Sequence, residues 1–336
     1  MIQEVIQKLI AGQDLGREEA RAVMDQIMSG GATDAQIGAF LVALRIKGET
    51  VDEIAGCAQA MREKATPIKT SRMDLIDTCG TGGDGSGTFN ISTTVAFVAC
   101  GAGLAVAKHG NRSISSACGS ADVLAELGVN IEAAPEKVGA CIDEVGIGFL
   151  FAVALHGAMK HAIGPRKELA TRTVFNALGP LTNPAGAKRQ LIGVYDGNLT
   201  DVVAGVLGEL GSERAFVVHG ADGLDEITLT GPTHISELNS GQVSTSEINP
   251  GDFGLEVVSV EALAGGDAAQ NAQILRDILD GKQGPQRDVV LLNAAAAIAA
   301  GGLADDMAGG IEVARESIDS GRARQALERL VEVSNA

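Results

Sequence analysis

The first seventy or so residues carry apolar positions at helical spacing. The positions that share one face of the first predicted helix are Ile2, Val5, Ile6, Leu9 and Ile10. Two threonines, Thr33 and Thr50, stand three positions before a glutamine and a glutamate, which is the sequence of a capping box at a helix start. No strand pattern occurs before residue 74. We therefore predict an all-helical N-terminal segment.

From residue 75 onward, short apolar runs alternate with helical stretches. The predicted strands span residues 75–77, 104–107, 149–153, 190–195 and 215–219. Helices are predicted from about residue 91, over 121–127 and from 135, and about the last seventy residues return to helix. Two further strands, 228–238 and 243–248, flank a turn sequence. This alternation is typical of an α/β fold with a central, mainly parallel sheet.

Composition and charge narrow the class of protein. A chain of 336 residues suggests roughly two domains. Because 45% of the residues are hydrophobic, the chain can bury a substantial core, which excludes a disordered protein. The net charge of −17 repels phosphate backbones, and 3% aromatic residues leave few platforms for base stacking. We therefore expect no nucleic-acid partner.

Targeting signals and cysteines give the expected compartment. The N-terminal sequence lacks the basic region and unbroken apolar stretch of a signal peptide. The longest alanine-rich run, residues 293–300, is far shorter than a membrane span. The five cysteines are widely spaced and form no C-x-x-C pair, which favours free thiols in a reducing compartment. We expect a cytoplasmic protein with no membrane partner, in which Cys79 could at most line a site.

The most informative segment follows the strand at 75–77. Five glycines lie between positions 80 and 87. Without Cβ atoms, such a loop lets several backbone N–H groups converge on one anion. Asn90, Ser92 and Thr93 then stand at the start of the next predicted helix, whose positive end suits a phosphate. The segment predicts a phosphate-binding loop.

Two better-known phosphate motifs do not account for this loop. Its glycines also match G-x-G-x-x-G, but that pattern alone is a weak signal. A dinucleotide fold would start its helix inside the motif and place an acidic residue about twenty residues later. Here the loop runs on to Asn90, and the next strand ends in Lys108 and His109. No Gly-Lys-Ser/Thr follows, so a Walker A loop is absent as well.

A second cluster closes the next predicted strand. Lys108 and Arg112 supply cations, while serines and Gly119 behind them supply short donors at another helix start. Ligands of an open α/β sheet lie at the carboxyl ends of its strands, so both motifs belong to one edge. A basic cluster beside a glycine loop in an acidic protein indicates a multiply phosphorylated small ligand. His109 alone is ambiguous and could simply orient the loop.

A third cluster, with Asp222, Asp225 and Glu226, follows the strand at 215–219. Adjacent carboxylates repel one another unless solvent or a cation compensates. Mg²⁺ is commonly bound through one or two carboxylates together with substrate phosphates and water. An Asp-Glu pair in a loop is usually solvated, but a phosphate site on the same sheet edge favours the metal interpretation.

Taken together, these motifs resemble the anthranilate phosphoribosyltransferase family. The matching segments, whose order and spacing agree over nearly the whole chain, are GTGGD at 80–84, NIST at 90–93, KHGNRS at 108–113, RTVFNALGPLTNPA at 172–185 and DGLDE at 222–226. The resemblance implies Mg²⁺-dependent transfer of 5-phosphoribosyl from phosphoribosyl pyrophosphate (PRPP) to the amine of anthranilate, with release of pyrophosphate, in tryptophan biosynthesis. It implies a homodimer, and a small all-helical domain (1–71 plus about 166–187) hinged to a larger α/β domain (72–165 and 188–336).

The resemblance also assigns site residues. The positions it implies for PRPP are Gly80, Gly83, Asp84, Thr88, Asn90, Ile91, Ser92, Thr93, Lys108, His109, Gly110, Asn111, Arg112, Ser113, Ser116 and Ser120. The positions it implies for anthranilate are Gly80, Asn111 and Arg166, and those for Mg²⁺, with two ions expected per site, are Ser92, Asp225 and Glu226. No residue is assigned as a general acid or base, because an aromatic amine is neutral at pH 7 and is already a nucleophile.

The acceptor side departs from the family pattern. Family members often have HPAMK where this chain has His156 followed by Gly157, and a proline where it has Val153. From the sequence alone, Arg166 is equally a helix-surface arginine or a guanidinium that forks onto the anthranilate carboxylate. Two other functions stay open: a pyrimidine nucleoside phosphorylase, which shares the fold by family analogy, and a non-catalytic relative that binds nucleic acid.

Overall fold

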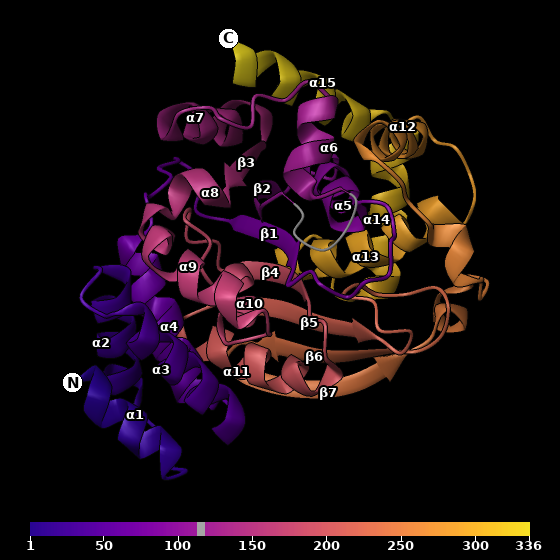
Figure 1. Cartoon of the computed structure of the whole chain (residues 1–336). Helices are drawn as coiled ribbons and strands as arrows, with labels where there is room; N and C mark the ends of the chain where they lie inside the picture. The colour runs from indigo at the N-terminus through magenta and orange to yellow at the C-terminus, as the bar shows by residue number, and fades with distance from the viewer. Residues whose placement is uncertain (113–117) are drawn as a thin grey trace.

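The computed structural model describes residues 1–112 and 118–336. Four helices form a bundle at the N-terminal end (indigo in Figure 1): α1 (Ile2–Ile10), α2 (Arg17–Met28), α3 (Asp34–Lys47) and α4 (Val51–Lys64). Thr33 and Thr50 both cap their helices in the predicted way, each accepting from the backbone N–H three residues on. One expectation for α1 is wrong: Ile10 is 67% exposed, whereas the other four apolar positions of its predicted face are buried.

The rest of the chain builds a seven-stranded sheet within the described residues. Its strands are β1 (Leu75–Gly80), β2 (Ala105–Gly110), β3 (Ile147–Phe151), β4 (Arg189–Gly193), β5 (Arg214–Gly220), β6 (Thr233–Asn239) and β7 (Gln242–Ile248). They are ordered β3-β2-β1-β4-β5-β6-β7, parallel from β3 to β5 and antiparallel from β5 to β7. The predicted α/β class, with a helical part and a mainly parallel sheet, is confirmed.

Helices cover both faces of this sheet (Figure 1). The remaining helices are α5 (Ile91–Gly101), α6 (Ser120–Glu126), α7 (Pro135–Val145), α8 (Ala152–Leu155), α9 (Lys160–Leu169), α10 (Phe175–Leu178), α11 (Thr200–Glu209), α12 (Ala268–Leu279), α13 (Pro285–Gly301), α14 (Met307–Asp319) and α15 (Arg322–Asn335). Short 3-10 helices are η1 (Gly157–Met159), η2 (Gly179–Leu181), η3 (Gly197–Leu199), η4 (Pro250–Phe253) and η5 (Val260–Leu263).

Two large apolar clusters lie on opposite sides of the sheet. One contains side chains of α5 and α13, such as Phe97 and Ile298, packed with side chains of β1 and β4. The other joins the helical bundle to α10 and α11, with Phe40 and Leu207 among its buried members. Because the same strands contribute to both clusters, the bundle packs onto the sheet through a continuous apolar contact.

The strand order places a topological switch point beside β1. The chain moves from β1 to β2 and β3 on one side, then returns to β4 on the other. Open α/β sheets bind ligands at the carboxyl ends of the strands beside such a switch point. The glycine loop after β1 begins at this edge. Among the described residues, no helix is both long and apolar enough to cross a membrane.

Candidate functional site

The glycine loop has a backbone that only glycine adopts readily. Gly82, Gly83, Gly85 and Gly87 have φ angles of 66°, 78°, 72° and 68°. Side chains other than hydrogen are disfavoured at such angles. The far end of the loop is fixed by a backbone hydrogen bond of 2.9 Å from Gly265 to the Gly87 carbonyl. We call residues 80–87 the phosphate loop.

Asp225, in the loop after β5, holds the near end of the phosphate loop. Its carboxylate accepts a 2.7 Å hydrogen bond from the Gly82 N–H. A Cβ on Gly80 would lie 2.4 Å from this carboxylate, and a Cβ on Gly193 would lie 1.5 Å from the Asp225 carbonyl oxygen. The two strand ends must therefore be glycine for the carboxylate to reach the loop. Glu226 likewise accepts a 3.0 Å bond from the Ser92 N–H at the start of α5.

The electrostatics of this acidic pair favour a cation. Burial, together with the charge of the neighbouring Asp84 carboxylate, raises the pKa of Asp225 to about 7. Burial first, then the charge of Asp225, raises the pKa of Glu226 well above its ordinary value. Both effects mean that the ionised pair lacks enough positive charge nearby. A divalent ion would supply that charge.

The donor set suits magnesium bound together with phosphate. Among the described residues, no group of three His, Cys, Asp or Glu side chains could hold a metal by itself. Mg²⁺ is typically bound by one or two carboxylates, with substrate phosphates and waters completing its shell. Asp225 and Glu226, with the Ser92 hydroxyl nearby, fit that pattern better than a metal cage made of protein alone.

Lys108 is a buried cation at the end of β2. It is 3% exposed, and its ammonium donates to the Thr78 carbonyl and, at 3.5 Å, to the Ser92 hydroxyl. The Lys108 charge also opposes the raised pKa of Glu226. The predicted grouping of Lys108 with Ser92 and the acidic pair is therefore present in the fold.

Asp77, which sequence analysis left out of the site, orders the backbone beside Lys108. Its carboxylate accepts from the His109 N–H at 3.0 Å and from the Asn183 amide at 2.8 Å. Asn183 also donates to the Ala107 carbonyl at 2.8 Å. This fully buried network ties β1 to β2 and to the segment after η2. Its members are far apart in sequence, so no local motif marks them as partners.

Asn90, predicted to contact a ligand, is held on two sides by protein. Its side-chain amide donates to the Cys118 carbonyl at 3.1 Å, and its oxygen accepts from Asn271 at 3.0 Å. Asn271 in turn accepts from the Gly266 N–H at 2.7 Å. Sequence analysis missed Asn271, which reaches the site from the start of α12. A buried asparagine on an otherwise apolar helix face was the available signal.

The other predicted PRPP positions occupy varied environments. Ile91 and Thr93 are each 1% exposed, so only their backbone groups could meet a ligand. Asn111 is exposed, and its carbonyl accepts from the Ser120 hydroxyl at 3.2 Å. Arg112 pairs with Asp122 at 2.7 Å. Two further predicted positions, Ser113 and Ser116, lie outside the described residues.

His109 and His156 form a buried pair beside this edge. Their Nε2 atoms are 3.2 Å apart, and the Gly179 carbonyl accepts from the His109 ring. Burial, together with the neighbouring His156 ring, lowers the pKa of His109 to about 3. Burial alone lowers the pKa of His156 to about 4. Both rings are therefore neutral near pH 7. With Gly179 holding one His109 nitrogen, His156 donates the hydrogen bond between the rings.

Arg166 lies in the last turn of α9, and Arg172 lies in the segment between α9 and α10. Arg166 lies over the Phe175 ring at 5.0 Å, and burial lowers the pKa of its guanidinium. No ion pair joins Arg166 to an acid among the described residues, which leaves its charge available to an anion. Arg172 donates to the Gly83 carbonyl at 2.6 Å and stacks on the Tyr195 ring at 4.1 Å. Sequence analysis missed both contacts of Arg172.

Comparisons with known proteins agree with this geometry. Residues 72–324 match the family described as "Glycosyl transferase family, a/b domain", and residues 3–65 match its helical bundle domain. Proteins named anthranilate phosphoribosyltransferase from Moorella thermoacetica and Anaeromyxobacter dehalogenans are 57% and 59% identical to the chain, each with 98% of both chains covered. The chain belongs to the anthranilate phosphoribosyltransferase family.

Solved structures of the same family superpose over nearly the whole chain. The Thermus thermophilus anthranilate phosphoribosyltransferase matches with a TM-score of 0.94 and 45% identity, covering 99% of each chain. A Saccharomyces cerevisiae enzyme in complex with PRPP and Mg matches with a TM-score of 0.90 and 29% identity, over 99% of this chain and 98% of that one. The family resemblance and the pentosyltransferase class expected from the sequence are confirmed.

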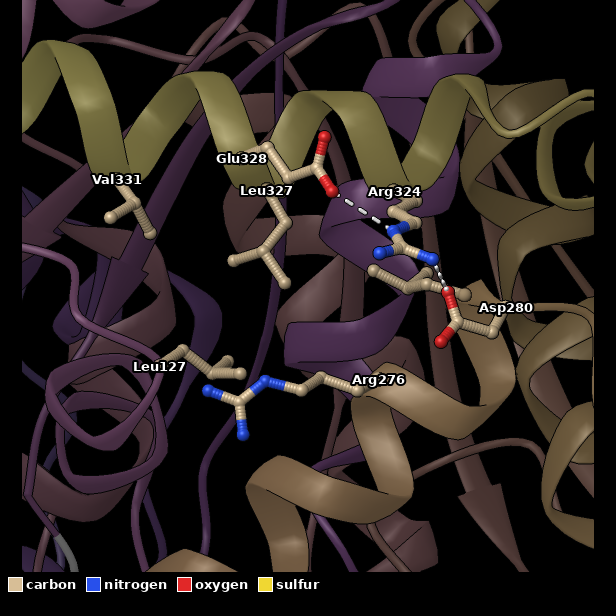
Figure 2. Close-up of a pocket in the computed structure, with 8 residues that line it drawn as sticks. Leu127, Arg276, Asp280, Arg324, Leu327, Glu328 and Val331 are labelled. Carbon is tan, nitrogen blue, oxygen red and sulfur yellow. Dashed lines mark hydrogen bonds and ion pairs between the residues drawn. The ribbon is translucent and has the colours of Figure 1, made fainter.

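A cavity of about 340 Å³ lies elsewhere, between the end of α6 and the helices α12 and α15 (Figure 2). Its apolar side includes Leu127 and Leu327. On its polar side Arg324 bonds to Asp280 at 2.6 Å and to Glu328 at 2.9 Å. None of the residues predicted for a phosphoribosyltransferase site lines this cavity, so it is not the candidate active site.

Proposed function

We propose that this member of the anthranilate phosphoribosyltransferase family transfers the 5-phosphoribosyl group of PRPP to the amine of anthranilate and releases pyrophosphate. The observation that carries the proposal is the meeting of the phosphate loop, buried Lys108 and the Asp225–Glu226 pair at one switch point. Amides, a cation and a metal-binding acid pair are the groups that a sugar carrying a diphosphate requires. The full-length similarity to enzymes of that name supports the choice of substrates.

PRPP would lie on the phosphate loop and the ends of β2 and α5. Gly83, Asp84, Lys108 and Ser120 are the contacts that we place nearest its phosphates. They lie in the loop after β1, near the end of β2 and at the start of α6. We propose Ser92, Asp225 and Glu226 as ligands for Mg²⁺, with two ions per site. When bound, Mg²⁺ neutralises charge on the departing pyrophosphate.

Anthranilate would bind beside Gly80, Asn111 and Arg166. The stacked, half-buried guanidinium of Arg166 has no acid partner among the described residues, so a carboxylate ligand satisfies it. The position of Arg166 on α9, outside the sheet, supports an acceptor site between the helical part and the strand edge. Val153 is 63% exposed and Gly157 is exposed, so this side of the site offers few fixed walls.

The chemistry is electrostatic and positional. Transfer forms the bond from the amine nitrogen to the ribose C1 and breaks the bond from C1 to the pyrophosphate oxygen, and the nitrogen loses one proton to water. Lys108 stabilises the negative charge on the departing pyrophosphate. Holding the amine in line with C1 supplies much of the remaining rate. Burial lowers the pKa values of the nearby His109 and His156, which makes both rings weak bases, and their Nε2 atoms are engaged with each other. This supports a mechanism without a dedicated general base.

We further propose that the enzyme works as a homodimer with two domains, 1–71 plus about 166–187 and 72–165 plus 188–336. Closure about the connecting segments would exclude water and limit PRPP hydrolysis. The packing of α9 (Lys160–Leu169) against α3 and α2 supports grouping the chain from about residue 166 with the helical domain.

A coupled assay of pyrophosphate release with PRPP, Mg²⁺ and anthranilate tests the function. We expect activity in the wild type and losses in Asp84→Ala, Lys108→Ala and Arg166→Ala. A parallel assay with thymidine or uridine and inorganic phosphate separates the phosphorylase alternative. Phosphorolysis without any use of PRPP would contradict the proposal.

A further inference from the structure

Arg172 makes a bridge between two parts of the molecule that the proposed reaction must bring together. It follows α9, which packs on the helical bundle, and precedes α10. Its guanidinium nevertheless reaches the phosphate loop, donating to the Gly83 carbonyl at 2.6 Å. The same group lies 4.1 Å from the centre of the Tyr195 ring, just after β4.

These two contacts restrain the guanidinium. The N–H groups of an arginine stacked on a ring point outward in a plane parallel to that ring, so the ring limits the direction of the hydrogen bond. Tyr195 is itself anchored, because its N–H donates to the Thr81 hydroxyl at 3.0 Å. Thr81 belongs to the phosphate loop, and its own N–H donates to the Gly193 carbonyl at 2.9 Å.

The phosphate loop is thus held at two successive glycines. Asp225 accepts from the Gly82 N–H, and Arg172 donates to the Gly83 carbonyl. The two bonds hold the peptide group before Gly82 and the peptide group after Gly83, residues whose φ angles are 66° and 78°. Glycine at these positions has wide conformational freedom, so external contacts must select the bound shape.

We propose that Arg172 is a positioning residue that holds the phosphate loop in its PRPP-binding conformation, with the Tyr195 ring as the platform that aims it. The inference rests on the proposed function, because it names how that same site is kept in order. Arg172 acts through the Gly83 carbonyl and need not touch either substrate. Its loss therefore weakens PRPP binding more than anthranilate binding.

Matched variants separate the stack, the charge and the hydrogen bond. Arg172→Lys keeps the charge but loses the planar group, and Arg172→Met loses both. Tyr195→Phe keeps the ring, whereas Tyr195→Leu removes it. Arg329→Lys, at a surface arginine paired only along its own helix with Glu332 among the described residues, controls for the substitution itself.

The chain offers a direct probe of the contact. Tyr195 is its single tyrosine, and there is no tryptophan, so protein emission excited near 280 nm reports on this ring. We expect the emission of the free protein to change in Arg172→Met and to stay constant in Arg329→Lys. Unchanged emission in Arg172→Met would overturn the stacking contact and with it the proposal.

Calorimetric titration with PRPP and Mg²⁺, alongside kinetics, tests the consequence. We expect Arg172→Lys, Arg172→Met and Tyr195→Leu to weaken PRPP affinity about tenfold, the order expected for losing one charged hydrogen bond. The anthranilate KM of these variants should stay within about twofold of the wild-type value. Tyr195→Phe should bind PRPP as the wild type does, because the charged hydrogen bond of Arg172, and not the phenol oxygen, carries the effect.

Three outcomes would overturn the role of Arg172: unchanged PRPP affinity in Arg172→Met, a rise confined to the anthranilate KM, or a Tyr195→Phe variant as weak as Tyr195→Leu. The binding titration needs no turnover. If the wild type bound PRPP but transferred nothing to anthranilate, the proposed function would fail while the loop role would still be decided by these affinities.

Discussion

The phosphate loop and the segment that carries Arg166 are linked through Arg172, which follows that segment and touches Gly83, yet the protein holds the two regions in different ways. Residues 80–87 receive hydrogen bonds or contacts from β4, from the loop after β5 and from Arg172. Residues 153–170, here called the acceptor segment, have fewer polar anchors. Arg166 is held by stacking on Phe175, and Val153 is 63% exposed.

This difference matches the tasks proposed for the two regions. A highly charged diphosphate needs amides and cations fixed before it arrives, because reorganising them during the reaction would cost much of their stabilisation. An aromatic acid needs an apolar slot and one cation, which an acceptor segment with fewer anchors provides. Substitutions on the phosphate side should therefore change kcat or the binding of PRPP, and those on the acceptor side should change the anthranilate KM alone.

The largest expected effect comes from Lys108→Ala. Removing a buried cation beside Asp77 and Glu226 leaves their carboxylates without compensation, which destabilises the fold by about 3–5 kcal/mol. Activity should fall roughly 100- to 1000-fold. Steady-state assays with urea unfolding measure both quantities, and exposed Lys282→Ala serves as the control. A stable, fully active Lys108→Ala enzyme would remove the distinction between the two regions.

Arg166→Ala should have a smaller and more selective effect. Losing one charged hydrogen bond to the acceptor raises the anthranilate KM roughly 10- to 100-fold while leaving the PRPP KM nearly constant. Exposed Lys167→Ala, one residue along the same helix, is the matched control. Kinetics with each substrate varied in turn provide the measurement. Equal changes in both KM values would place Arg166 on the phosphate side instead.

The buried histidine pair predicts a dependence of stability on pH. The folded-state pKa of His156, about 4, lies below its ordinary value of 6.5, so the unfolded chain binds more protons between these values. Neutral His156 therefore contributes to the free energy of unfolding above pH 6.5, and this contribution is lost as the pH falls towards 4. Between pH 8 and pH 5, wild type should lose about 2 kcal/mol relative to His156→Gln.

Urea unfolding of both proteins at each pH measures this difference. Asp225 is present in both proteins, so the comparison with His156→Gln cancels its contribution to the free energy of unfolding. That contribution has the opposite pH dependence, because a raised folded-state pKa favours the folded protein at low pH. Glutamine keeps an N–H donor towards His109 without titrating in this range. A gap between the two proteins that stays constant with pH would show that His156 is not held neutral by burial.

Gly157→Ala should give the smallest effect. An added Cβ meets no atom within 4 Å, and the residue begins a short 3-10 helix. Because alanine restricts the unfolded chain, we expect a gain of about 0.4–1 kcal/mol in the free energy of unfolding. Turnover should stay within about twofold. A marked loss of activity would mean that the acceptor segment depends on the freedom of this glycine.

Local sequence patterns predicted the parts of the site that depend on neighbours in the chain. The capping boxes at Thr33 and Thr50 and the glycine loop after β1 are short-range features, and the structure has them. Periodicity placed the strands to within a few residues. The sequence placed Ile10 on the buried face, but it is exposed because the position at the end of α1 lies beyond the packed stripe.

Contacts between distant segments were not predictable in the same way. Arg172 and Gly83 are 89 positions apart, and Gly82 and Asp225 are 143 apart. Helical and strand periodicity cannot predict contacts over such separations, because the order of the strands in the sheet brings these residues together. The family resemblance predicted roles for single residues but not the contacts between them. The roles of Arg172 and Asn271 and the hydrogen bond of His156 were therefore found only in the structure.

The most direct test of the account is a crystal structure with PRPP and Mg²⁺ bound. The account predicts the diphosphate against the amides of residues 82–87 and the Lys108 ammonium, with metal density beside Asp225 and Glu226. Arg172 should still contact the Gly83 carbonyl in that complex. A diphosphate bound away from the ends of β1 and β2, with the phosphate loop empty, would contradict it.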